Sequence, residues 1–513
     1  MNIARERNFI DSSQLGLDFA QLKNQVLRTA PALQETLEKK GNETLYDHAL
    51  RYKEIEKSPA AKDRQAEFVA VVVEQVERLL GVEVAHSVER QLEQNYFVST
   101  VDHHGPICHP FFLNANLITA TPQADFNLEN IIVLSCANVS LNNSSFPRGL
   151  IFHSDIGNTQ ELHRLSFFPA KDSQRAVYGL EGYTQKDLTR IKKMLKHKVL
   201  DGLIRHETVE KITRLIDVVY GQSDVLESKN YSEQITKTNF RFWQQLFAPY
   251  KKLPNLVYID QETITSNLLI KYHLNQNTIV NQIIFNAKYQ QLLIKYFEGI
   301  IGAFSKNDIG TFLFWAKPKG EKYRQRLWKK NGGLINADGT FCVPLTALVI
   351  SEKLQSGELV PSMLLTFILI SFYYGVTCLG GFSQPSYLTA MKAGYLQLLQ
   401  EIGESEEAGM CKQIETKIMG GDIALAFLQD KNGSLFQATG LDLMLYGTNS
   451  TWNKIVESAK GMSLQNGVDS MMPLFYEVMY PENKRDKKLQ NITVDQIAQL
   501  EGFNNKVKPC IEL

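Results

Sequence analysis

The sequence predicts an α/β protein with a parallel sheet, and three observations support this fold class. Two β-rich runs, at 96–100 and 131–136, flank a helix-like segment at 111–120, which is the order of a strand–helix–strand unit. The segment before this unit is charged and patterned as helices, and the chain after it is largely helical. We therefore expect a helical N-terminal subdomain at 1–95, an α/β core at 96–350 and a mostly helical C-terminal region at 351–513.

The individual elements follow from local patterns. Residues 67–80 carry apolar side chains at helical spacing, and Gly81 is suited to end that helix. Residues 149–153 and 256–259 read as further strands, 184–220 as a lysine-rich helical segment and 262–304 as helices with short loops. A strand–turn piece is expected at 311–344, helices at 361–430, and a mixed polar tail after Asn449.

Composition limits the classes of partner. Lys+Arg and Asp+Glu number 55 each in 513 residues, so no overall charge favours nucleic acid or an anionic membrane. The six cysteines are scattered without a CxxC pair, which is typical of a reducing cytoplasm. We expect a cytoplasmic protein that binds a small molecule and no nucleic acid.

Targeting and membrane signals are weak. The stretch Met1–Arg7 lacks the apolar core of a signal peptide. Leu359–Met391 contains no charged residue and is long enough to cross a bilayer, but Pro361, Gly375 and Gly380-Gly381 interrupt it. A buried helix followed by a tight turn is the favoured interpretation.

The segment Thr100–Pro110, TVDHHGPICHP, is the strongest candidate for a functional site. It gathers Asp102, His103, His104, Gly105, Cys108 and His109. In a strand–helix–strand unit the loop after the strand faces the ligand crevice, and the N-terminus of the next helix favours an anion. Histidines here can contact a phosphate or transfer a proton. Asp102, His103 and His109 are therefore candidate catalytic residues, with His104 and Gly105 as substrate-binding residues.

Two other interpretations of this segment stay open. His103, His104 and His109, joined by His153, could bind zinc, iron or manganese and leave one position open, although their spacing matches no strong metal motif. The histidines could also simply bind the carbonyl groups of a structural loop.

The same segment resembles the first loop of bacillithiol synthase, the cysteine-adding enzyme family, and is similar, more distantly, to the HxGH loop of nucleotidylyltransferase-like Rossmann proteins. Thr100, Gly105 and Pro110 fall in the register of the first loop, with Asp102 and His103 at its polar pair. His109 departs from both patterns: it replaces the second glycine of one and lies three positions too late for the final histidine of the other. The resemblance, which covers about forty residues, implies a Rossmann-like core and a nucleotide as a possible cofactor.

The loop after the second strand adds polar candidates. Asn138, Asn142 and Arg148 can hold a substrate through neutral and bidentate hydrogen bonds, although a surface turn explains the same composition. Cys136, at the end of an apolar strand, is interpreted as a small buried residue, and Cys108, between histidines, as a conceivable thiolate.

Two further stretches are candidates for the wall of a pocket. Residues 315–330 hold seven cations, one acid and three aromatic residues, which is typical either of a polyphosphate site or of a solvated hairpin. The sequence Gly380-Gly381 precedes Gln384 and Tyr387, which can line a pocket or allow close helix packing.

Together these features predict an enzyme of ligase or transferase type that acts on a small polar or phosphorylated substrate. A metal-dependent hydrolase or lyase that uses the same histidines is the alternative. A non-enzymatic interaction protein with a helical binding surface is the third possibility.

Overall fold

The structure is a computed structural model that describes residues 12–513 except 56–57, 157–160, 249, 251–252, 306–309 and 331. The segment Met1–Arg7, which we examined for a signal peptide, lies outside the described residues.

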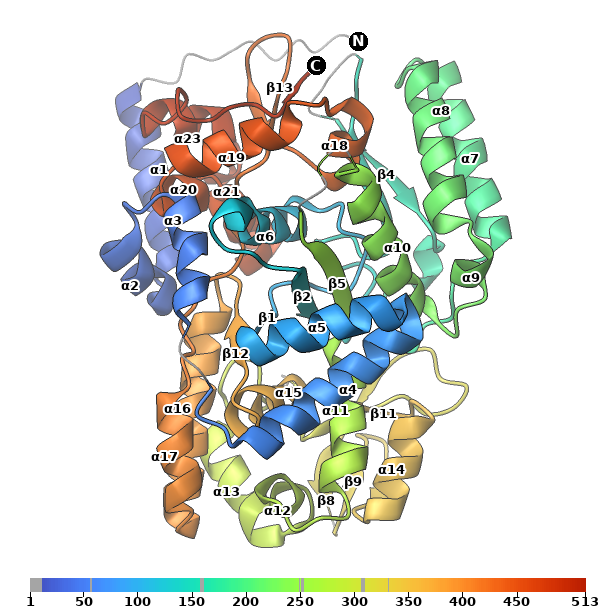
Figure 1. Ribbon diagram of the computed structural model, residues 1–513, viewed down its shortest axis with the longest axis vertical. Helices are drawn as coiled ribbons and strands as arrows, with labels where there is room; N and C mark the ends of the chain where they lie inside the picture. The colour runs from blue at the N-terminus through green and yellow to red at the C-terminus, as the bar shows by residue number, and fades with distance from the viewer. Residues whose placement is uncertain are drawn as a thin grey trace.

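A four-stranded parallel sheet forms the centre of the molecule (Figure 1). Its order is β12 (Thr377–Leu379), β1 (Phe97–Ser99), β2 (Asn130–Ser135) and β5 (Asn255–Asp260). Ser99 pairs with Val133, and the whole of β2 pairs with β5. Helix α6 (Pro110–Ala120) connects β1 to β2, so the predicted strand–helix–strand unit and the α/β class are confirmed.

The two faces of the sheet belong to two separate apolar cores, because successive side chains of a strand point to opposite faces. On one face the strand residues pack with α6 and α10 (Tyr231–Leu246); on the other they pack with α4 (Lys62–Leu80), α5 (Val82–Gln94) and α11 (Gln261–Leu268). The first face carries Phe97, Ile131, Val133, Leu256 and Tyr258, and the second carries Val98, Ile132, Leu134, Val257 and Ile259. Both faces are covered, as is usual for parallel sheets.

The half of the molecule drawn above the sheet in Figure 1 combines the two ends of the chain with its middle. Its elements, besides α6 and α10, are α1 (Ser12–Leu27), α2 (Pro31–Lys40), α3 (Leu45–Leu50), β3 (Gly149–His153), β4 (Leu162–Ser166), α7 (Gln185–Leu200), α8 (His206–Leu215), α9 (Ser223–Leu226), β13 (Phe427–Gln429), β14 (Leu435–Gln437), α18 (Gly440–Tyr446), α19 (Thr451–Gly461), α20 (Leu464–Asp469), α21 (Met472–Met479), α22 (Lys487–Gln490), α23 (Val494–Leu500) and β15 (Ile511–Glu512). The C-terminal elements pack directly on α1 and α3.

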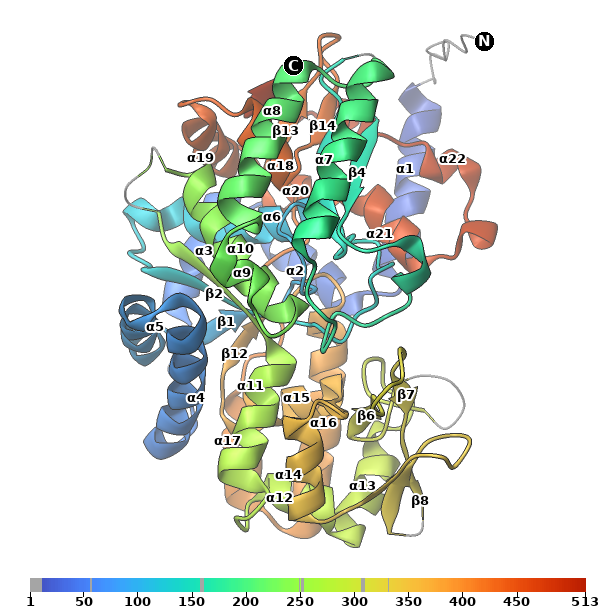
Figure 2. The ribbon, with the colours of Figure 1, turned by 90° about the vertical axis from the view of Figure 1, so that its right-hand side faces the viewer.

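The half below the sheet is built from α4, α5 and the described residues of 261–413 (Figures 1 and 2). Its elements, besides α4, α5 and α11, are α12 (Ile279–Phe285), α13 (Ala287–Phe297), β6 (Phe314–Ala316), β7 (Gln325–Arg326), β8 (Trp328–Lys330), β9 (Gly333–Ile335), β10 (Cys342–Pro344), α14 (Ala347–Gln355), β11 (Leu359–Pro361), α15 (Met363–Phe367), α16 (Gln384–Ile402) and α17 (Ser405–Gln413). Strands β6 to β11 form two small antiparallel sheets, which agrees with the strand–turn piece expected at 311–344.

Short 3-10 and π-helical turns complete the elements. They are η1 (Arg51–Glu54), η2 (Thr121–Ala124), η3 (Ala170–Asp172), η4 (Ile216–Tyr220), η5 (Leu269–His273), η6 (Ile368–Tyr373) and η7 (Glu482–Lys484). The π-turns η4, η5 and η6 each directly follow an α-helix.

The predicted helix at 67–80 is confirmed as the C-terminal part of α4. Phe68, Val72 and Val76 are buried along one side of it, and Gly81 follows with a φ of 94°. An L side chain rarely adopts that φ, so glycine is suited to this helix end.

Two predicted helical segments are wrong in part. The segment 184–220 is divided, with α7 ending at Leu200, α8 beginning at His206 and the π-turn η4 at its end. The segment 361–430 contains the strand β12. It has only three residues, all of them buried, and it is an edge strand of the central sheet. A strand of three residues within a continuous apolar stretch shows no alternation of its own, so the hydrophobic pattern does not reveal it.

The apolar stretch Leu359–Met391 is divided among β11, α15, the π-helical turn η6, β12 and the start of α16. Nearly all of its side chains up to Phe382 are buried. Among the described residues, no helix combines the length and hydropathy that crossing a bilayer requires.

Candidate functional site

The carboxyl edge of the central sheet brings together segments that are far apart in the sequence. The 100–110 loop leaves β1 there and runs for a short distance beside the residues that follow β2. The amide of Cys136 donates to the carbonyl of Asp102, and the amide of His104 donates to the carbonyl of Cys136, each at 2.8 Å. His103 and Cys136 are therefore neighbours across a parallel bridge.

Asp102 is fully buried at this edge. Its Oδ2 accepts from Nδ2 of Asn116 at 3.1 Å, while its Oδ1 has no hydrogen-bond partner among the described residues. Burial raises the pKa of the Asp102 carboxyl to about 8, and the charge of Asp422 acts in the same direction. Asp102 is therefore a carboxylic acid that stays largely protonated at neutral pH.

His104 is a structural residue. Its Nδ1 lies 2.6 Å from the Ser135 hydroxyl, its Nε2 lies 3.0 Å from the Ser232 carbonyl oxygen, and its ring stacks on Tyr258. Ser232 in turn donates to Asp260 at 2.6 Å. Because both ring nitrogens have protein partners, His104 joins the 100–110 loop to β2, α10 and β5.

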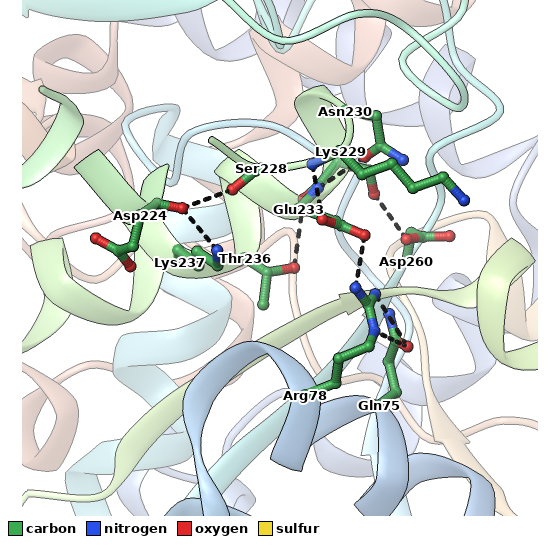
Figure 3. A network of polar contacts seen from close by, with 11 residues as sticks. Gln75, Arg78, Asp224, Ser228, Lys229, Asn230, Glu233, Thr236, Lys237 and Asp260 are labelled. Carbon is green, nitrogen blue, oxygen red and sulfur yellow. Dashed lines mark hydrogen bonds and ion pairs between the residues drawn. The ribbon is translucent and has the colours of Figure 1, made fainter. Parts of the chain in front are cut away.

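Figure 3 shows how the start of α10 is fixed above the end of β5. Glu233 accepts from Arg78 of α4 at 2.8 Å and from the amide of Lys229 at 3.0 Å, and its own amide donates to Asn230. Asp260 lies beside this network. Arg78 of α4 and Asp260 at the carboxyl end of β5 thus both bind the first turn of α10.

Gly105 lies where no side chain fits. A Cβ atom built there would be 2.7 Å from Cα of Pro147, which is backbone and cannot rotate away. The Gly105 carbonyl accepts from Nδ2 of Asn239 at 2.9 Å, and Oδ1 of the same side chain accepts the amide of Ile107 at 3.2 Å. Asn239 of α10 therefore fixes the shape of the loop.

His103 and His109 are half-buried, and the rings of both contact that of Phe112. Nδ1 of His103 is 3.0 Å from Oδ1 of Asn143, an acceptor, so a neutral His103 carries its lone pair on Nε2. Nδ1 of His109 accepts the amide of Phe111 at 3.2 Å, so Nε2 of His109 carries the proton. Burial lowers the pKa of His103, and burial together with the charges of His103 and Arg164 lowers that of His109 to about 3. The pair offers one acceptor and one donor.

We expected the first turn of α6 to offer free N–H groups to an anion, but these groups already have partners within the protein. Pro110 has no amide hydrogen, the amide of Phe111 is bonded to His109, and those of Phe112 and Leu113 donate to the His109 carbonyl. His109 is the N-cap residue itself, so its ring occupies the place that an anion would take.

Two cations lie over one aromatic ring of the loop after β2. The guanidinium groups of Arg148 and Arg164 lie over the ring of Phe146, at 5.1 and 5.8 Å from its centre. Nε of Arg148 is buried and has no hydrogen-bond partner among the described residues. Phe146 has a left-handed φ of 52°, which is costly for an aromatic residue and is typical of functional loops. The structure therefore places Arg148 where it can bind an anion.

The candidate substrate-binding asparagines differ in position. Asn138 is half-buried at the carboxyl edge, where its carbonyl and its Oδ1 both accept from Arg324. Asn142 is exposed, and its Oδ1 accepts from Ser140 at 2.5 Å. Of the two, Asn138 lies near the buried groups of the sheet edge.

The basic stretch 315–330 reaches the same edge from the lower half of the molecule. Arg324 stacks on Trp315, with 4.5 Å between the guanidinium carbon and the ring centre, and Lys317 donates to the Gly179 carbonyl. In Figure 2, β6 and β7 lie at the right of the lower half of the molecule. Cations do lie over aromatic rings here, as in a solvated hairpin, but Arg324 also bonds the loop after β2, and Lys317 bonds the loop that precedes α7.

Cys136 is half-buried, not fully buried as we expected, and it contacts a carboxyl group. Its Sγ is 3.4 Å from Oε1 of Glu262, the second residue of α11. Glu262 accepts the amides of Ala137 and Asn138 at 2.9 and 3.1 Å. Burial raises the pKa of the Glu262 carboxyl to about 7, and burial together with the Glu262 charge raises the pKa of the Cys136 thiol.

A third buried carboxyl group reaches this edge from residues 419–422. Gly420 donates to the carbonyl of Gly380, and Asp422, with a left-handed φ of 61°, accepts the amide of Phe382 at 2.8 Å. Burial raises the pKa of Asp422 to about 6. A Cβ on Gly381 would meet Oδ2 of Asp422 at 2.3 Å, which explains this glycine.

Gln384 and Tyr387, which follow Gly380-Gly381, also lie near the carboxyl edge of the central sheet. Gln384 donates to the Thr100 hydroxyl at 2.7 Å. Burial raises the pKa of Tyr387, and the charges of Cys136, Cys378 and Asp422 add to the shift, so the phenol lies among these groups.

The four histidines of the metal interpretation have separate partners. Nδ1 of His153 lies 2.7 Å from Oδ2 of Asp442, which also accepts the amide of Thr439 at the start of α18. His104 is held by Ser135 and Ser232. Among the described residues, no group of three or more His, Cys, Asp or Glu side chains is arranged to hold a metal ion.

Two concave surfaces of the described chain lie elsewhere. One, of about 510 Å³, is lined by residues of α2, α3 and 413–419, and the other, of about 710 Å³, lies between α7 and α8. None of the candidate residues from the sequence lines either surface.

The sequence did not single out Glu262, Arg324 or Asp422 as site residues. Glu262 and Asp422 are isolated acids in ordinary contexts, and Arg324 was one of seven cations. The one available signal was position, because Glu262 follows a predicted strand by three residues. Comparison of the sequence with protein-family models and with curated proteins gives no match.

Proposed function

We propose that this protein is an enzyme of ligase or transferase type that acts on a small polar or phosphorylated substrate at the carboxyl edge of the central sheet. The observation that carries the proposal is Glu262, a buried carboxyl group with a pKa raised to about 7, held beside the Cys136 thiol. A carboxyl group with a pKa near the working pH is suited to both accept and release a proton.

The cations account for the anionic end of the substrate. Arg148 and Arg164 lie together over Phe146, and His109 adds an N–H donor at Nε2. A guanidinium group binds phosphate or carboxylate through two parallel hydrogen bonds. The reacting end of the substrate would then lie toward Cys136, which is the bridge neighbour of His103.

The fold supports the location of this site. We extend the proposal to a Rossmann-like core, because helices cover both faces of a parallel sheet and β1 lies inside it, between β12 and β2. In such sheets the ligand crevice lies outside the carboxyl ends of the strands. A nucleotide that binds there would agree with the resemblance of the 100–110 loop to bacillithiol synthase.

A ligand-binding experiment tests the proposal. Thermal unfolding would be followed with inorganic phosphate, nucleotides, sugar phosphates and amino acids, because a ligand of the native state raises the Tm. For a phosphate-bearing ligand that binds, Arg148→Met should weaken the Kd by about tenfold or more, since a bidentate contact is lost.

The control is Arg28→Met, in the exposed turn directly after α1, which should leave the Kd unchanged. Equal affinities in the Arg148→Met and Arg28→Met proteins would contradict the proposed anion site. Metal content measured on the same untagged protein examines the hydrolase alternative: stoichiometric zinc, iron or manganese that is lost on His103→Ala would favour it.

A further inference from the structure

Cys136 differs from the other cysteines in its surroundings. Cys108, Cys378, Cys411 and Cys510 are buried, and Cys342 is exposed on β10. Cys136 is half-buried at the end of β2, with its Sγ 3.4 Å from a carboxylate oxygen. It is thus a half-buried cysteine whose thiol already contacts a proton acceptor.

Glu262 is oriented toward the thiol by the backbone. The amides of Ala137 and Asn138, the two residues that follow Cys136, both donate to its carboxylate. Because α11 begins directly after β5, the carboxylate is fixed at both ends: by its own helix and by the loop that carries the thiol. A proton can pass between the two groups without any movement of the backbone.

Arg324 supplies the positive charge of this cluster. It donates to the carbonyl and to Oδ1 of Asn138, and its charge acts on both Cys136 and Glu262. The other titratable groups that face the pair are Tyr387 of α16, Asp260 at the end of β5 and Tyr178 in the loop that precedes α7.

We propose that Cys136 is the nucleophile of an acyl-transfer reaction, with Glu262 as the group that takes its proton and Arg324 as the cation that offsets the negative charge. This inference rests on the proposed function and narrows it to acyl transfer. The substrate class is a carboxylic acid derivative (an ester, an amide or an acyl phosphate) with a separate anionic group for Arg148.

The reaction balances in two steps. In the first, the thiol proton moves to the Glu262 carboxylate, the sulfur forms a bond to the acyl carbon, and the bond from that carbon to the leaving group breaks. The leaving group departs with the proton from Glu262, and the acyl group remains on Cys136 as a thioester. In the second step an amine, alcohol or water loses a proton to Glu262, attacks the thioester and releases Cys136, which recovers the proton. No group is oxidised or reduced.

The resting pair is a neutral thiol beside a carboxylate. Thiol and carboxylate share one negative charge whichever group holds the proton, so transfer of the proton does not add charge to the buried site. As the thiolate forms, Glu262 becomes neutral and Arg324 remains as the opposite charge.

The test uses para-nitrophenyl acetate as the acyl donor and the full chain. The protein is mixed with the ester, the reaction is stopped with acid, and acetylation of the Cys136 and Cys342 peptides is measured in one sample by mass spectrometry. Release of para-nitrophenolate is followed in parallel, so that acetyl groups passed on to water are also counted. Cys342 is the internal reference, because it is an exposed thiol in the same molecule.

At about pH 8 we expect acetyl transfer through Cys136 to exceed acetylation of Cys342 by about tenfold or more, a threshold below the roughly 10²–10⁴-fold that a positioned base usually contributes. Its rate should rise with pH through about 7, because Glu262 must lose its proton to act as the base. Glu262→Gln should slow the reaction at Cys136 by about tenfold or more and leave Cys342 unaffected. Cys136→Ala should remove the fast release of para-nitrophenolate.

A Cys136 that reacts no faster than Cys342 in the unaltered protein overturns the inference, and this comparison needs no variant to fold. Where Glu262→Gln is folded by circular dichroism and keeps the unaltered rate at Cys136, the inference is also overturned. The Arg148→Met titration distinguishes failure of this inference from failure of the proposed function. If a ligand binds in a way that depends on Arg148 but Cys136 is not acylated, the proposed function stands and only the acyl-transfer step is removed.

Discussion

At the scale of single residues, the candidate site contains three buried carboxyl groups that hold their protons more tightly than usual. Asp102, Glu262 and Asp422 have pKa values raised to about 8, 7 and 6, in each case chiefly by burial. A buried carboxyl group with one hydrogen-bond donor, such as Asp102, costs most when ionised. Buried carboxyl groups with different surroundings can have different pKa values, which suits them to different roles in proton transfer.

Asp102→Asn tests this at the residue scale. The carboxyl group has a folded-state pKa of about 8 against an ordinary value of 3.8, so between these values the folded protein holds a proton that the unfolded chain has released. Stability of the unaltered protein therefore falls as pH rises across this window and levels off above it. Relative to the unaltered protein, Asp102→Asn should gain on the order of 1 kcal/mol for each pH unit within the window.

Urea unfolding at several pH values between about 5 and 9 measures this difference. Asp201→Asn, at the exposed end of α7, is the matched control and should leave the pH dependence of the unaltered protein in place. A constant difference between Asp102→Asn and the unaltered protein across the window would contradict the raised pKa.

At the scale of elements, α10 organises the 100–110 loop although it lies more than a hundred residues away in sequence. Its Asn239 is fully buried and bonds the backbone of Gly105 and Ile107, and its Ser232 contacts His104 and Asp260. The shape of the loop therefore depends on a helix that lies between α9 and β5 in the chain as well as on the loop's own Gly105.

Asn239→Leu tests the role of α10. It leaves a buried carbonyl at Gly105 and a buried amide at Ile107 without partners, and each unpaired group costs about 1–3 kcal/mol. We expect a loss of about 2–4 kcal/mol in the free energy of unfolding, measured with urea. Asn504→Leu, on the exposed surface near the C-terminus, should change stability by about 0.5 kcal/mol or less. A small loss for Asn239→Leu, equal to that of the control, would show that the loop holds its shape without α10.

At the scale of the whole molecule, the central sheet and both of its covering layers draw on every part of the chain. Strand β12 comes from the C-terminal segment, α4 and α5 come from the N-terminal segment, and one apolar core joins α1–α3 to α19–α23. Burial of both faces of the sheet is the main source of its stability.

A fragment of residues 96–350 tests this dependence. It lacks β12 and the helices α4 and α5, so β1 becomes an exposed edge and one apolar face loses its cover. We expect the fragment to be insoluble or to lack the dispersed amide spectrum of a folded protein by NMR, whereas the full chain should show one. A fragment that folds alone would demonstrate an independent core within the boundaries that the sequence suggests.

Much of the secondary structure near the site was predictable, because it depends on local patterns. The apolar runs of β1, β2 and β5, the helix α6 between the first two, and the helix that ends before Gly81 all have clear signals in the sequence. Strand β12 has no such signal, because three residues between apolar helices are too few to show the alternation of a strand. The division of the helical segment 184–220 was missed although Asp201-Gly202 is a turn signal, and Gly202 has a left-handed φ of 68°.

The sequence by itself determined the α/β class, the parallel pairing of β1 with β2, and the place of the 100–110 loop at the end of β1, since each follows from periodicity and chain order. The tertiary structure alone decided which side chains meet there. It brings Glu262 and Arg324 to Cys136 from residues more than a hundred positions away, and it gives His104 and His153 structural partners. The physical reason is that ionisation and reactivity depend on burial and on neighbours in space, and the folded chain sets both.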